Sequence, residues 1–347
     1  MKKTFIFVLL LGGIALLGLG PVQAQSPILH FSQNGTFKIV QFTDLHFDPA
    51  RSESLHGVAC IEAVLNAEHP DFVIFSGDSF WGSPAREAMN TLLAPVLKRK
   101  IPYAFCWGNH DDEQDMSRAQ IQQMVEAQPN NCGFTAPDVS GFSNFALPIY
   151  ASDAYVGGIV TSSAKPVFVL YCFDSKAYST LPDVKGYGWV HWDQIAWYAQ
   201  TSDQYKEDNE GKPVPAMAFF HIPLPEYLDA VQAEPAKMIG SRMETVAAPK
   251  INSGLFTAFL EQGDVMATFV GHDHDSDYIV EWYNVLLAYG RYSGGNTVYN
   301  NLPDGSGARV ILINQTQPRQ FRTWVRLMDG RIQNDITYPR DFRERAK

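Results

Sequence analysis

Charged side chains are scarce in this sequence of 347 residues: they make up 18% of it, against the roughly 25% usual for soluble domains. Acidic residues outnumber basic ones by 37 to 27, and no basic stripe follows any segment. This balance disfavours a nucleic acid polymer as a partner. Hydrophobic residues, in contrast, make up 46% of the sequence, which is enough for a large core and excludes a mainly disordered chain.

Cysteine is also scarce. The four cysteines are Cys60, Cys106, Cys132 and Cys172, and none of them forms a CxxC pair. A zinc site built from thiolates is therefore disfavoured. Four cysteines allow three disulfide pairings, and the sequence alone does not decide among these pairings and buried free thiols.

Long hydrophobic runs are absent except at the N-terminus. Lys2 and Lys3 precede an apolar stretch over residues 5–20, and Pro21 and small residues up to Ala24 follow it. The stretch is shorter than the ~20 residues of a spanning helix, and its order is typical of a cleaved signal peptide. We therefore predict that residues 1–24 are a signal peptide. The protein would be exported to the periplasm or the extracellular medium, with no stable membrane insertion after cleavage.

Linkers, repeats and low-complexity segments are absent from residues 28–345, so we predict a single domain over residues 25–347. Strand-like runs over 37–43, 71–76 and 102–107 alternate with helical spacing over 52–68 and after Pro84. Polar residues at the ends of these strands are 34 and 31 positions apart, as in βαβ units with parallel strands. Asn34-Gly35 lies between two short apolar runs and predicts a hairpin turn.

The rest of the chain reads as a mixture of strands and helices. We expect helices near 115–128 and from Trp192, and strands over 167–173, 216–220, 264–270, 309–314 and 321–328. The predicted fold class is therefore α/β, with one mixed sheet on each side of the core.

Five of the predicted strands end in side chains that can bind metals or move protons. These are Asp44 and His46, then Asp78, then Asn109 and His110, then His221, and lastly His272 and His274. Each could alone be a surface turn, a loop start or a packed histidine. Ligands of open α/β sheets bind outside the carboxyl ends of the strands, so five such ends together favour one functional site.

In this order, the motifs Asp44-x-His46, Gly77-Asp78, Gly108-Asn109-His110-Asp111, His221 and Gly271-His272-x-His274 resemble those of the calcineurin-like metallophosphoesterase superfamily. The resemblance covers about residues 37–280. Segments 187–189, 252–256 and 271–275 are similar to the purple-acid-phosphatase-like branch that lacks the long N-terminal domain. The resemblance implies a four-layer sandwich, in which two mixed β-sheets are flanked by helices.

The resemblance also implies two transition metal ions. One ion would be bound by Asp44, His46 and His274, the other by Asn109, His221 and His272, and Asp78 would bridge them. Two such ions clamp the attacking and leaving oxygens in phosphoryl transfer, and a metal-bound hydroxide is the nucleophile. Imidazole and oxygen ligands suit iron, zinc or manganese better than calcium, and the sequence does not choose among the three.

Other roles follow from the same resemblance. His110 would contact the phosphoryl oxygen or protonate the leaving group, and Asp111 would orient the His110 imidazole or cap a helix. Asn109 would also face the substrate. Arg291, in a Gly-rich and Ser-rich loop, is either a phosphate contact or a solvated surface residue. Trp81 stands where purple enzymes have a metal-binding tyrosine, so we expect a colourless or weakly coloured protein.

We therefore predict a secreted or periplasmic phosphoric ester hydrolase that acts on a small phosphorylated substrate, with a preference for phosphomonoesters. The alternatives are a phosphodiesterase acting on nucleotides or phospholipid headgroups, and a non-catalytic extracellular protein that binds phosphate through its metals. The natural substrate and the oligomeric state do not follow from the sequence.

Overall fold

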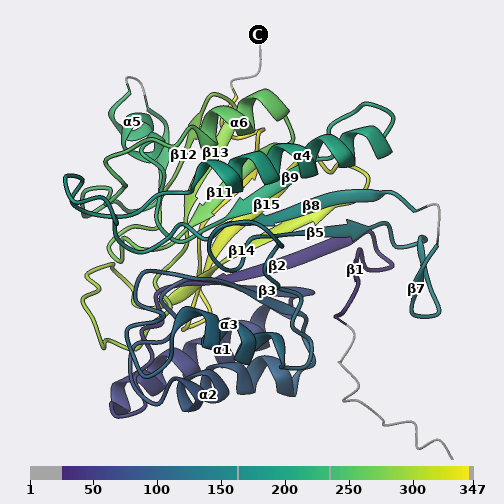
Figure 1. Cartoon of the computed structure of the whole chain (residues 1–347). Helices are drawn as coiled ribbons and strands as arrows, with labels where there is room; N and C mark the ends of the chain where they lie inside the picture. The colour runs from purple at the N-terminus through teal and green to yellow at the C-terminus, as the bar shows by residue number, and fades with distance from the viewer. Residues whose placement is uncertain (1–25, 162–163, 234–235, 344–347) are drawn as a thin grey trace, which may run out of the picture.

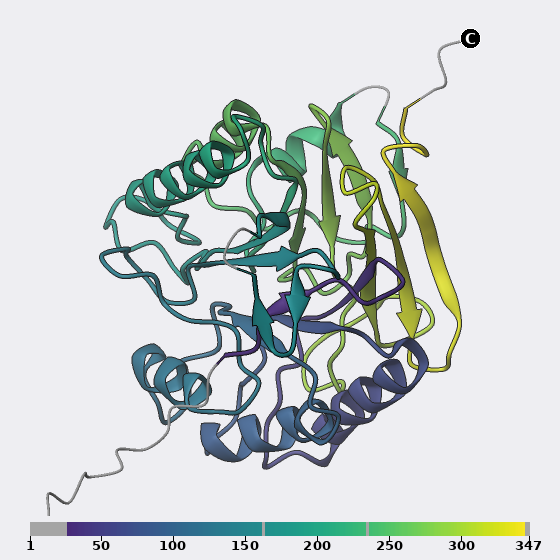
Figure 2. The same cartoon turned by 90° about the vertical axis from the view of Figure 1, so that its right-hand side faces the viewer.

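The computed structural model of the chain describes residues 26–161, 164–233 and 236–343. The predicted signal peptide, residues 1–24, lies outside the described residues. Two large β-sheets face each other, and helices cover the outer face of each sheet (Figures 1 and 2). The four layers confirm the predicted architecture of two mixed sheets flanked by helices.

The first sheet has six strands in the order β16-β15-β14-β2-β3-β4. Its strands are β2 (Thr36–Phe42), β3 (Phe72–Ser76), β4 (Tyr103–Cys106), β14 (Gly307–Asn314), β15 (Phe321–Leu327) and β16 (Ile332–Tyr338). Strands β2, β3 and β4 are parallel, with Val40 opposite Val73 and Ile74 opposite Ala104. The helical segments of this half are η1 (Ser52–Ser54), α1 (Leu55–Glu68), α2 (Ala85–Lys98) and α3 (Arg118–Glu126). The predicted alternation of strands and helices is confirmed here.

The second sheet has eight strands in the order β1-β5-β8-β9-β11-β13-β12-β10. Its strands are β1 (Leu29–His30), β5 (Phe145–Tyr150), β8 (Pro166–Cys172), β9 (Ala216–Phe219), β10 (Met238–Ile239), β11 (Val265–Val270), β12 (Ile279–Trp282) and β13 (Val285–Tyr289). Its helices are α4 (Trp192–Asp208), α5 (Glu226–Gln232) and α6 (Leu255–Gln262). Strands β6 (Tyr155–Val156) and β7 (Ile159–Val160) form a separate small hairpin.

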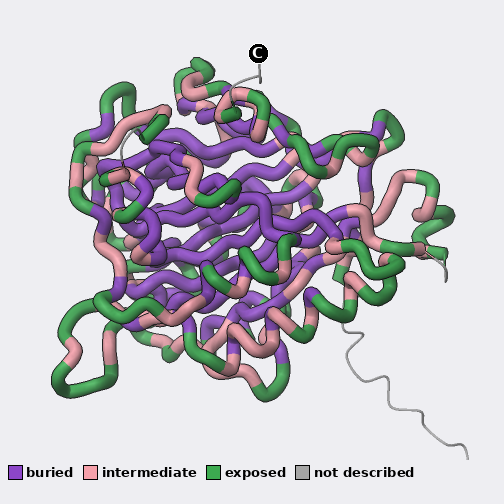
Figure 3. Tube along the Cα trace, turned by 90° about the horizontal axis from the view of Figure 1, so that it is seen from above, coloured by how far each residue is buried: buried purple, intermediate pink, exposed green. Residues whose placement is uncertain are grey.

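Three hydrophobic clusters hold the layers together. One lies between the two sheets and includes Ile39, Ile74 and Phe219. A second joins α1, α2 and α3 to the six-stranded sheet, and the third joins α4, α5 and α6 to the eight-stranded sheet. Buried backbone therefore runs through the centre of the molecule, with exposed loops around it (Figure 3). Burial of this much apolar surface is the main force that stabilises such a sandwich.

A disulfide between Cys106 and Cys172 joins β4 of one sheet to β8 of the other. The remaining cysteines, Cys60 and Cys132, are free and buried. The sequence left open disulfide bonds and buried free thiols, and the structure contains one disulfide and two buried free thiols. Within the described ranges, no helix combines the length and hydropathy that crossing a membrane requires.

The predicted hairpin at Asn34-Gly35 is wrong in its pairing. The tight turn exists, since the Ser32 amide donates to Thr36 O at 3.0 Å and Gly35 has φ of 79°. However, β1 pairs in parallel with β5 of the eight-stranded sheet, whereas β2 lies in the six-stranded sheet. The turn therefore passes the chain from one sheet to the other, because β1 pairs with β5 whereas β2 is paired on both sides, with β3 and β14.

Candidate metal centre

The side chains predicted to form the site follow five strands from both sheets. The loops after β2, β3 and β4 come from the six-stranded sheet, and those after β9 and β11 come from the eight-stranded sheet. The structure buries seven of the predicted residues, each at most 7% exposed: Asp44, His46, Asp78, Asn109, His221, His272 and His274. Asp44 and His274, which are 230 positions apart in the chain, meet at this end of the sandwich.

One group of potential metal ligands consists of Asp44, His46 and His274. The Nε2 atoms of the two histidines are 3.1 Å apart, and His274 Nε2 is 3.6 Å from Asp44 Oδ1. Two nitrogens that bind one metal ion at about 2.1 Å lie about 3.0 Å apart in octahedral geometry and about 3.4 Å apart in tetrahedral geometry. The spacing of the two imidazoles therefore suits a single transition metal ion.

A second group consists of Asp78, His221 and His272. Asp78 Oδ2 lies 3.0 Å from His221 Nε2 and 3.7 Å from His46 Nε2, which belongs to the first group. His221 Nε2 is also 3.9 Å from Asp44 Oδ1. The Asp78 carboxylate therefore lies between the two groups, which is the position that a bridging ligand needs.

Carbonyl groups orient two of these imidazoles. His221 Nδ1 lies 2.9 Å from Ser76 O, and His274 Nδ1 lies 3.0 Å from Tyr299 O. A ring that donates its Nδ1 proton to a carbonyl keeps the Nε2 lone pair free for a metal. The backbone thus favours the tautomer that presents Nε2 to the centre of the site.

Several buried polar atoms of the site have no hydrogen-bond partner in the described part of the chain. They include Asn109 Oδ1 and His272 Nε2. A buried polar atom without a partner costs free energy, and native proteins rarely leave several of them in one place. Metal ions would satisfy these atoms, so the residues present fit a binuclear centre.

Burial perturbs the pKa values of the same side chains. It raises the pKa of the Asp44 carboxyl and lowers the pKa of His46 and His272 well below the usual value. Burial also opposes the charged forms of Asp78 and His221, but each stabilises the charge of the other. As a result the pKa of Asp78 is well below its usual range, and the pKa of His221 is raised to about 9. Asp78 and His221 therefore form a buried ion pair, and a metal ion bound at His221 Nε2 would displace the proton of this imidazole, because a histidine ligand is neutral.

The backbone of the site is strained. Asp44, His46, Asp78 and His272 all have positive φ, with values of 56°, 42°, 50° and 78°. Few residues other than glycine adopt this region, and such outliers concentrate at functional sites. The neighbouring glycines permit close packing, since a Cβ on Gly77 would collide with the His221 ring and one on Gly108 with Asp78. Steric hindrance therefore explains why glycine stands before Asp78 and before Asn109.

His110 lies at the edge of the centre, with its side chain 31% exposed. Its ring centroid is 5.5 Å from that of His46, and its backbone N–H donates to Asp78 Oδ1 at 2.8 Å. His110 Nδ1 lies 2.5 Å from Glu113 Oε2. Glu113 was missed by the sequence reasoning, although its place three residues after His110 in the same turn is a signal that could have identified it.

The prediction that Asp111 orients the His110 imidazole is wrong. The buried Asp111 carboxylate instead accepts hydrogen bonds from four backbone N–H groups, those of Asp78, Ser79, Phe80 and Gly108, at 2.7–3.0 Å. Nor does Asp111 cap a helix, since α3 begins after its N-cap Ser117. The carboxylate thus joins the loop of Asp78 to the loop of Asn109. It binds these backbone N–H groups rather than the His110 imidazole, which lies on the outer side of the turn.

We expect Asp111→Ala to lower the free energy of unfolding by about 3 kcal/mol, since it leaves four loop N–H groups without their acceptor in a buried position. Burial, followed by the charge of Asp78, raises the pKa of Asp111 to about 6, so urea unfolding should be measured at pH 8. Asp203→Ala, which removes an exposed carboxyl on α4, is the matched control. An Asp111→Ala variant as stable as the control would contradict the role of this carboxylate.

The predicted phosphate contact of Arg291 is also wrong. Its side chain is fully buried, and Nη1 donates to Asp277 Oδ2 at 2.7 Å while Nε donates to Gly305 O at 2.9 Å. A further donor of the guanidinium is bound by Pro303 O. The donors of the guanidinium are bound to these internal partners because the surrounding loops fold over the side chain. Arg291 therefore cannot reach a substrate.

Aromatic side chains surround the ligand groups. Trp81 is 36% exposed and meets the His46 ring edge-on, with centroids 5.8 Å apart. Tyr187 meets the His272 ring edge-on at 4.3 Å, and Tyr299 stacks on His274 at 4.5 Å. These rings restrict the orientation of the imidazoles. Tyr299 gave no signal in the sequence, because it lies in a loop without a motif.

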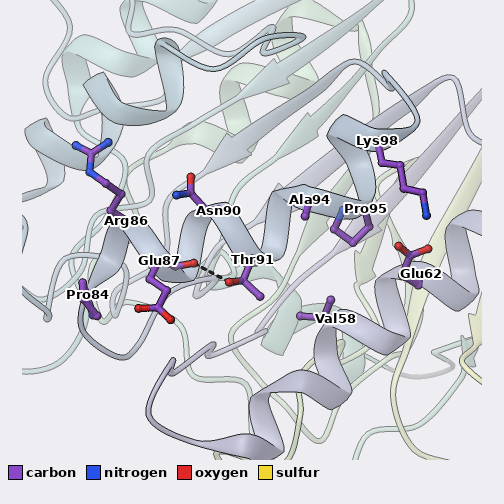
Figure 4. A pocket seen from close by; sticks show the side chains of 10 residues that line it. All are labelled: Val58, Glu62, Pro84, Arg86, Glu87, Asn90, Thr91, Ala94, Pro95 and Lys98. Atoms are coloured by element: carbon purple, nitrogen blue, oxygen red, sulfur yellow. Dashed lines mark hydrogen bonds between the residues drawn. The ribbon is translucent and has the colours of Figure 1, made fainter.

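A large surface hollow lies elsewhere. It has a volume of about 710 Å³ and lies between α1 and α2, with Val58, Pro84 and Ala94 among its lining residues (Figure 4). No residue of the two ligand groups lines it. Its position on the outer face of the helices separates it from the strand ends, so size alone does not identify the functional site.

Comparisons with known proteins show the family and the fold of the chain. The family described as calcineurin-like phosphoesterase matches residues 37–276. A protein of Arabidopsis thaliana named probable inactive purple acid phosphatase 29 is 33% identical over 359 residues, which cover 92% of this chain and 90% of the relative. Phosphatase DCR2 of Saccharomyces cerevisiae is 32% identical over 341 residues, which cover 89% of this chain and 57% of the relative. A dimetal phosphatase of Danio rerio has the same fold, with a TM-score of 0.56 at 12% identity over 87% of this chain and 98% of its own.

Proposed function

Because the chain belongs to the calcineurin-like phosphoesterase family, we propose that it is a binuclear metal hydrolase of phosphate esters, with a preference for phosphomonoesters. The observation that carries this proposal is the pair of buried ligand groups with Asp78 between them. Metals that only brace a fold have closed ligand shells, whereas a catalytic site leaves positions open. With Asp78 shared, each ion would have four protein ligands, which leaves two positions open in an octahedral shell.

The proposed ligand assignment is supported by the two distance-defined groups and, for Asn109, by a buried side-chain oxygen without a partner in the described part of the chain. Asp44, His46 and His274 would bind one ion, whereas His221, His272 and the unpartnered Asn109 Oδ1 would bind the other. Asp78 would be shared. When bound, the ions supply positive charge for the phosphoryl oxygens and lower the pKa of a bound water.

The protein groups around the ions would position the substrate and move protons. His110 is exposed enough to meet a substrate, and Glu113 at Nδ1 would hold the ring with Nε2 toward the ester oxygen. A proton from Nε2 would then pass to the departing alcohol as the P–O bond breaks, and Glu113 would stabilise the protonated imidazole before it transfers the proton. Asp111 would hold the loops of Asp78 and Asn109 at a fixed separation.

A second candidate function is supported by the names of the relatives. The Arabidopsis relative described above carries the word inactive in its name, so a non-catalytic protein that binds phosphate through its metals is an alternative. The yeast relative is named a phosphatase. Both candidate functions use the same metal-ligand groups, so only a measurement of substrate turnover distinguishes them.

The decisive assay compares p-nitrophenyl phosphate with bis-p-nitrophenyl phosphate. We expect faster turnover of the monoester, loss of turnover after chelation, and recovery when manganese, zinc or iron is restored. Faster turnover of the diester would instead favour a phosphodiesterase. Phosphate binding without turnover of either compound, at two bound metals per chain, would favour the non-catalytic alternative.

We also propose that the protein is exported after cleavage following Ala24. The N-terminal pattern supports this, and the Cys106–Cys172 disulfide is compatible with an oxidising compartment. The test is the intact mass of protein recovered from the periplasm or medium of an expressing bacterium. A mature chain that begins at Gln25 is expected, whereas full-length protein confined to the cytoplasm would contradict export.

A further inference from the structure

A cavity of about 320 Å³ adjoins the loops of the metal centre. Its lining includes Phe142, Tyr178 and Trp189, and the charged residues Arg118, Asp174 and Lys176. We call it the side pocket. Its volume lies at the lower end of the range for small-molecule sites, and it is large enough for one aromatic group.

Two connections place the side pocket next to the metal centre. Arg118, which lines the pocket, donates through Nη2 at 2.6 Å to Gly108 O, immediately before Asn109. Tyr178, which also lines the pocket, stacks on Tyr187 with ring centroids 5.9 Å apart, and Tyr187 in turn contacts His272. A phosphoryl group at the metal centre would therefore have its ester substituent within reach of this pocket.

The charges in the side pocket are already matched. Arg118 Nη2 donates to Asp112 Oδ1 at 2.6 Å, and its Nη1 lies 3.9 Å from Asp174 Oδ1. Lys176 Nζ donates to Ser140 O at 2.6 Å. Because two carboxylates accompany the two cations, the pocket offers no excess positive charge for a second anionic group.

The remaining surface is aromatic. Phe142 and Trp189 are half-buried, whereas Tyr178 is 49% exposed. Aromatic walls around a charge-neutral pocket favour a flat, uncharged aromatic group, which gains both apolar burial and ring contacts. An alkyl alcohol such as glycerol would gain much less.

From this placement, and resting on the proposed function, we infer that the side pocket binds the leaving group of the substrate and selects esters of planar aromatic groups. Two sources share this chemistry: phenols and the bases of nucleosides. Trp189 and Phe142 would be specificity residues, because they contact the leaving group and neither the metals nor the phosphoryl group.

The test uses phenylphosphonate and methylphosphonate, which carry the same phosphonate group and differ in the ring. Their affinities for the metal-loaded protein are measured by calorimetry. We expect the phenyl compound to bind about tenfold more tightly. Trp189→Ala and Phe142→Ala should each remove most of this preference and change methylphosphonate binding little. Circular dichroism checks the fold of each variant. Two variants are made so that the test still stands if one of them does not fold.

Trp192→Ala is the matched control, because Trp192 is 80% exposed on α4 and does not line the side pocket. It should keep the full preference. Equal affinity of the wild-type protein for both phosphonates would overturn the inference, as would a preference that survives in both wall variants.

Turnover distinguishes the two sources of the aromatic group. Phenyl phosphate, adenosine 5′-monophosphate and glycerol 2-phosphate are compared by kcat/KM in wild type and Trp189→Ala. A loss of about tenfold confined to the phenyl ester points to phenols, and one confined to the nucleotide points to nucleosides. Equal losses on all three esters would contradict the inference. Absence of all turnover would refute the proposed function instead, whereas the phosphonate affinities would still decide the role of the side pocket.

Discussion

Replacement of Asp78 by asparagine is expected to lower kcat/KM by about a thousandfold or more and to reduce the metal content of the protein. The Asp78 carboxylate lies between the two ligand groups, 3.0 Å from His221 Nε2 and 3.7 Å from His46 Nε2. An amide has nearly the same shape but lacks the negative charge. A thousandfold loss corresponds to about 4 kcal/mol of transition-state stabilisation.

Metal content by elemental analysis and turnover of p-nitrophenyl phosphate measure this effect together. Asp203→Asn, which changes an exposed carboxyl on α4 in the same way, should leave both values at the wild-type level. Full activity with normal metal content in Asp78→Asn would rule out the bridging role. Normal metal content without activity would leave Asp78 in the reaction but not as a required ligand.

Replacement of His110 by alanine is expected to leave both metals in place and to lower kcat by about a hundredfold to ten-thousandfold. The ring stands beside His46 without belonging to either ligand group, and Glu113 contacts its Nδ1. If His110 protonates the leaving group, the loss must depend on the alcohol. It should be much larger for an alkyl ester than for p-nitrophenyl phosphate, whose leaving group needs no proton.

His56→Ala provides the control, because His56 is an exposed histidine on α1. It should have wild-type turnover on both esters. An equal loss for alkyl and p-nitrophenyl esters in His110→Ala would exclude proton donation to the leaving group and leave a role in binding the phosphoryl oxygens. Loss of a metal from this variant would instead make His110 a ligand.

The fold and the ligand groups could be predicted because their signals are local. Each ligand follows a strand of apolar residues, and the strands end where the sequence pattern ends, as at Phe42 and Val270. Parallel strands bring their carboxyl ends to one edge of a sheet, so motifs far apart in the chain meet there. The family match then confirms the resemblance that the motifs carried.

The errors arose where a side chain has partners that only the folded structure brings together. The partners of Asp111 are four backbone N–H groups, three of which lie more than 30 positions away in the sequence. Arg291 sits among glycines and serines, which predict an exposed loop, but Asp277 and the carbonyls of a later loop enclose it. The short strand β1 offered no signal for its partner β5, since two residues carry almost no register information.

Metal content tests the central claim most directly. Purified protein is analysed for transition metals as isolated and again after supply of iron, zinc and manganese, beside a variant in which His221 and His274, one from each group, are replaced by alanine. We predict about two metal ions per chain in the wild-type protein and none retained by the variant. Wild-type protein that binds no transition metal under any of these conditions would contradict the binuclear centre and the function proposed from it. Equal metal content per chain in the wild-type protein and the variant would contradict them too.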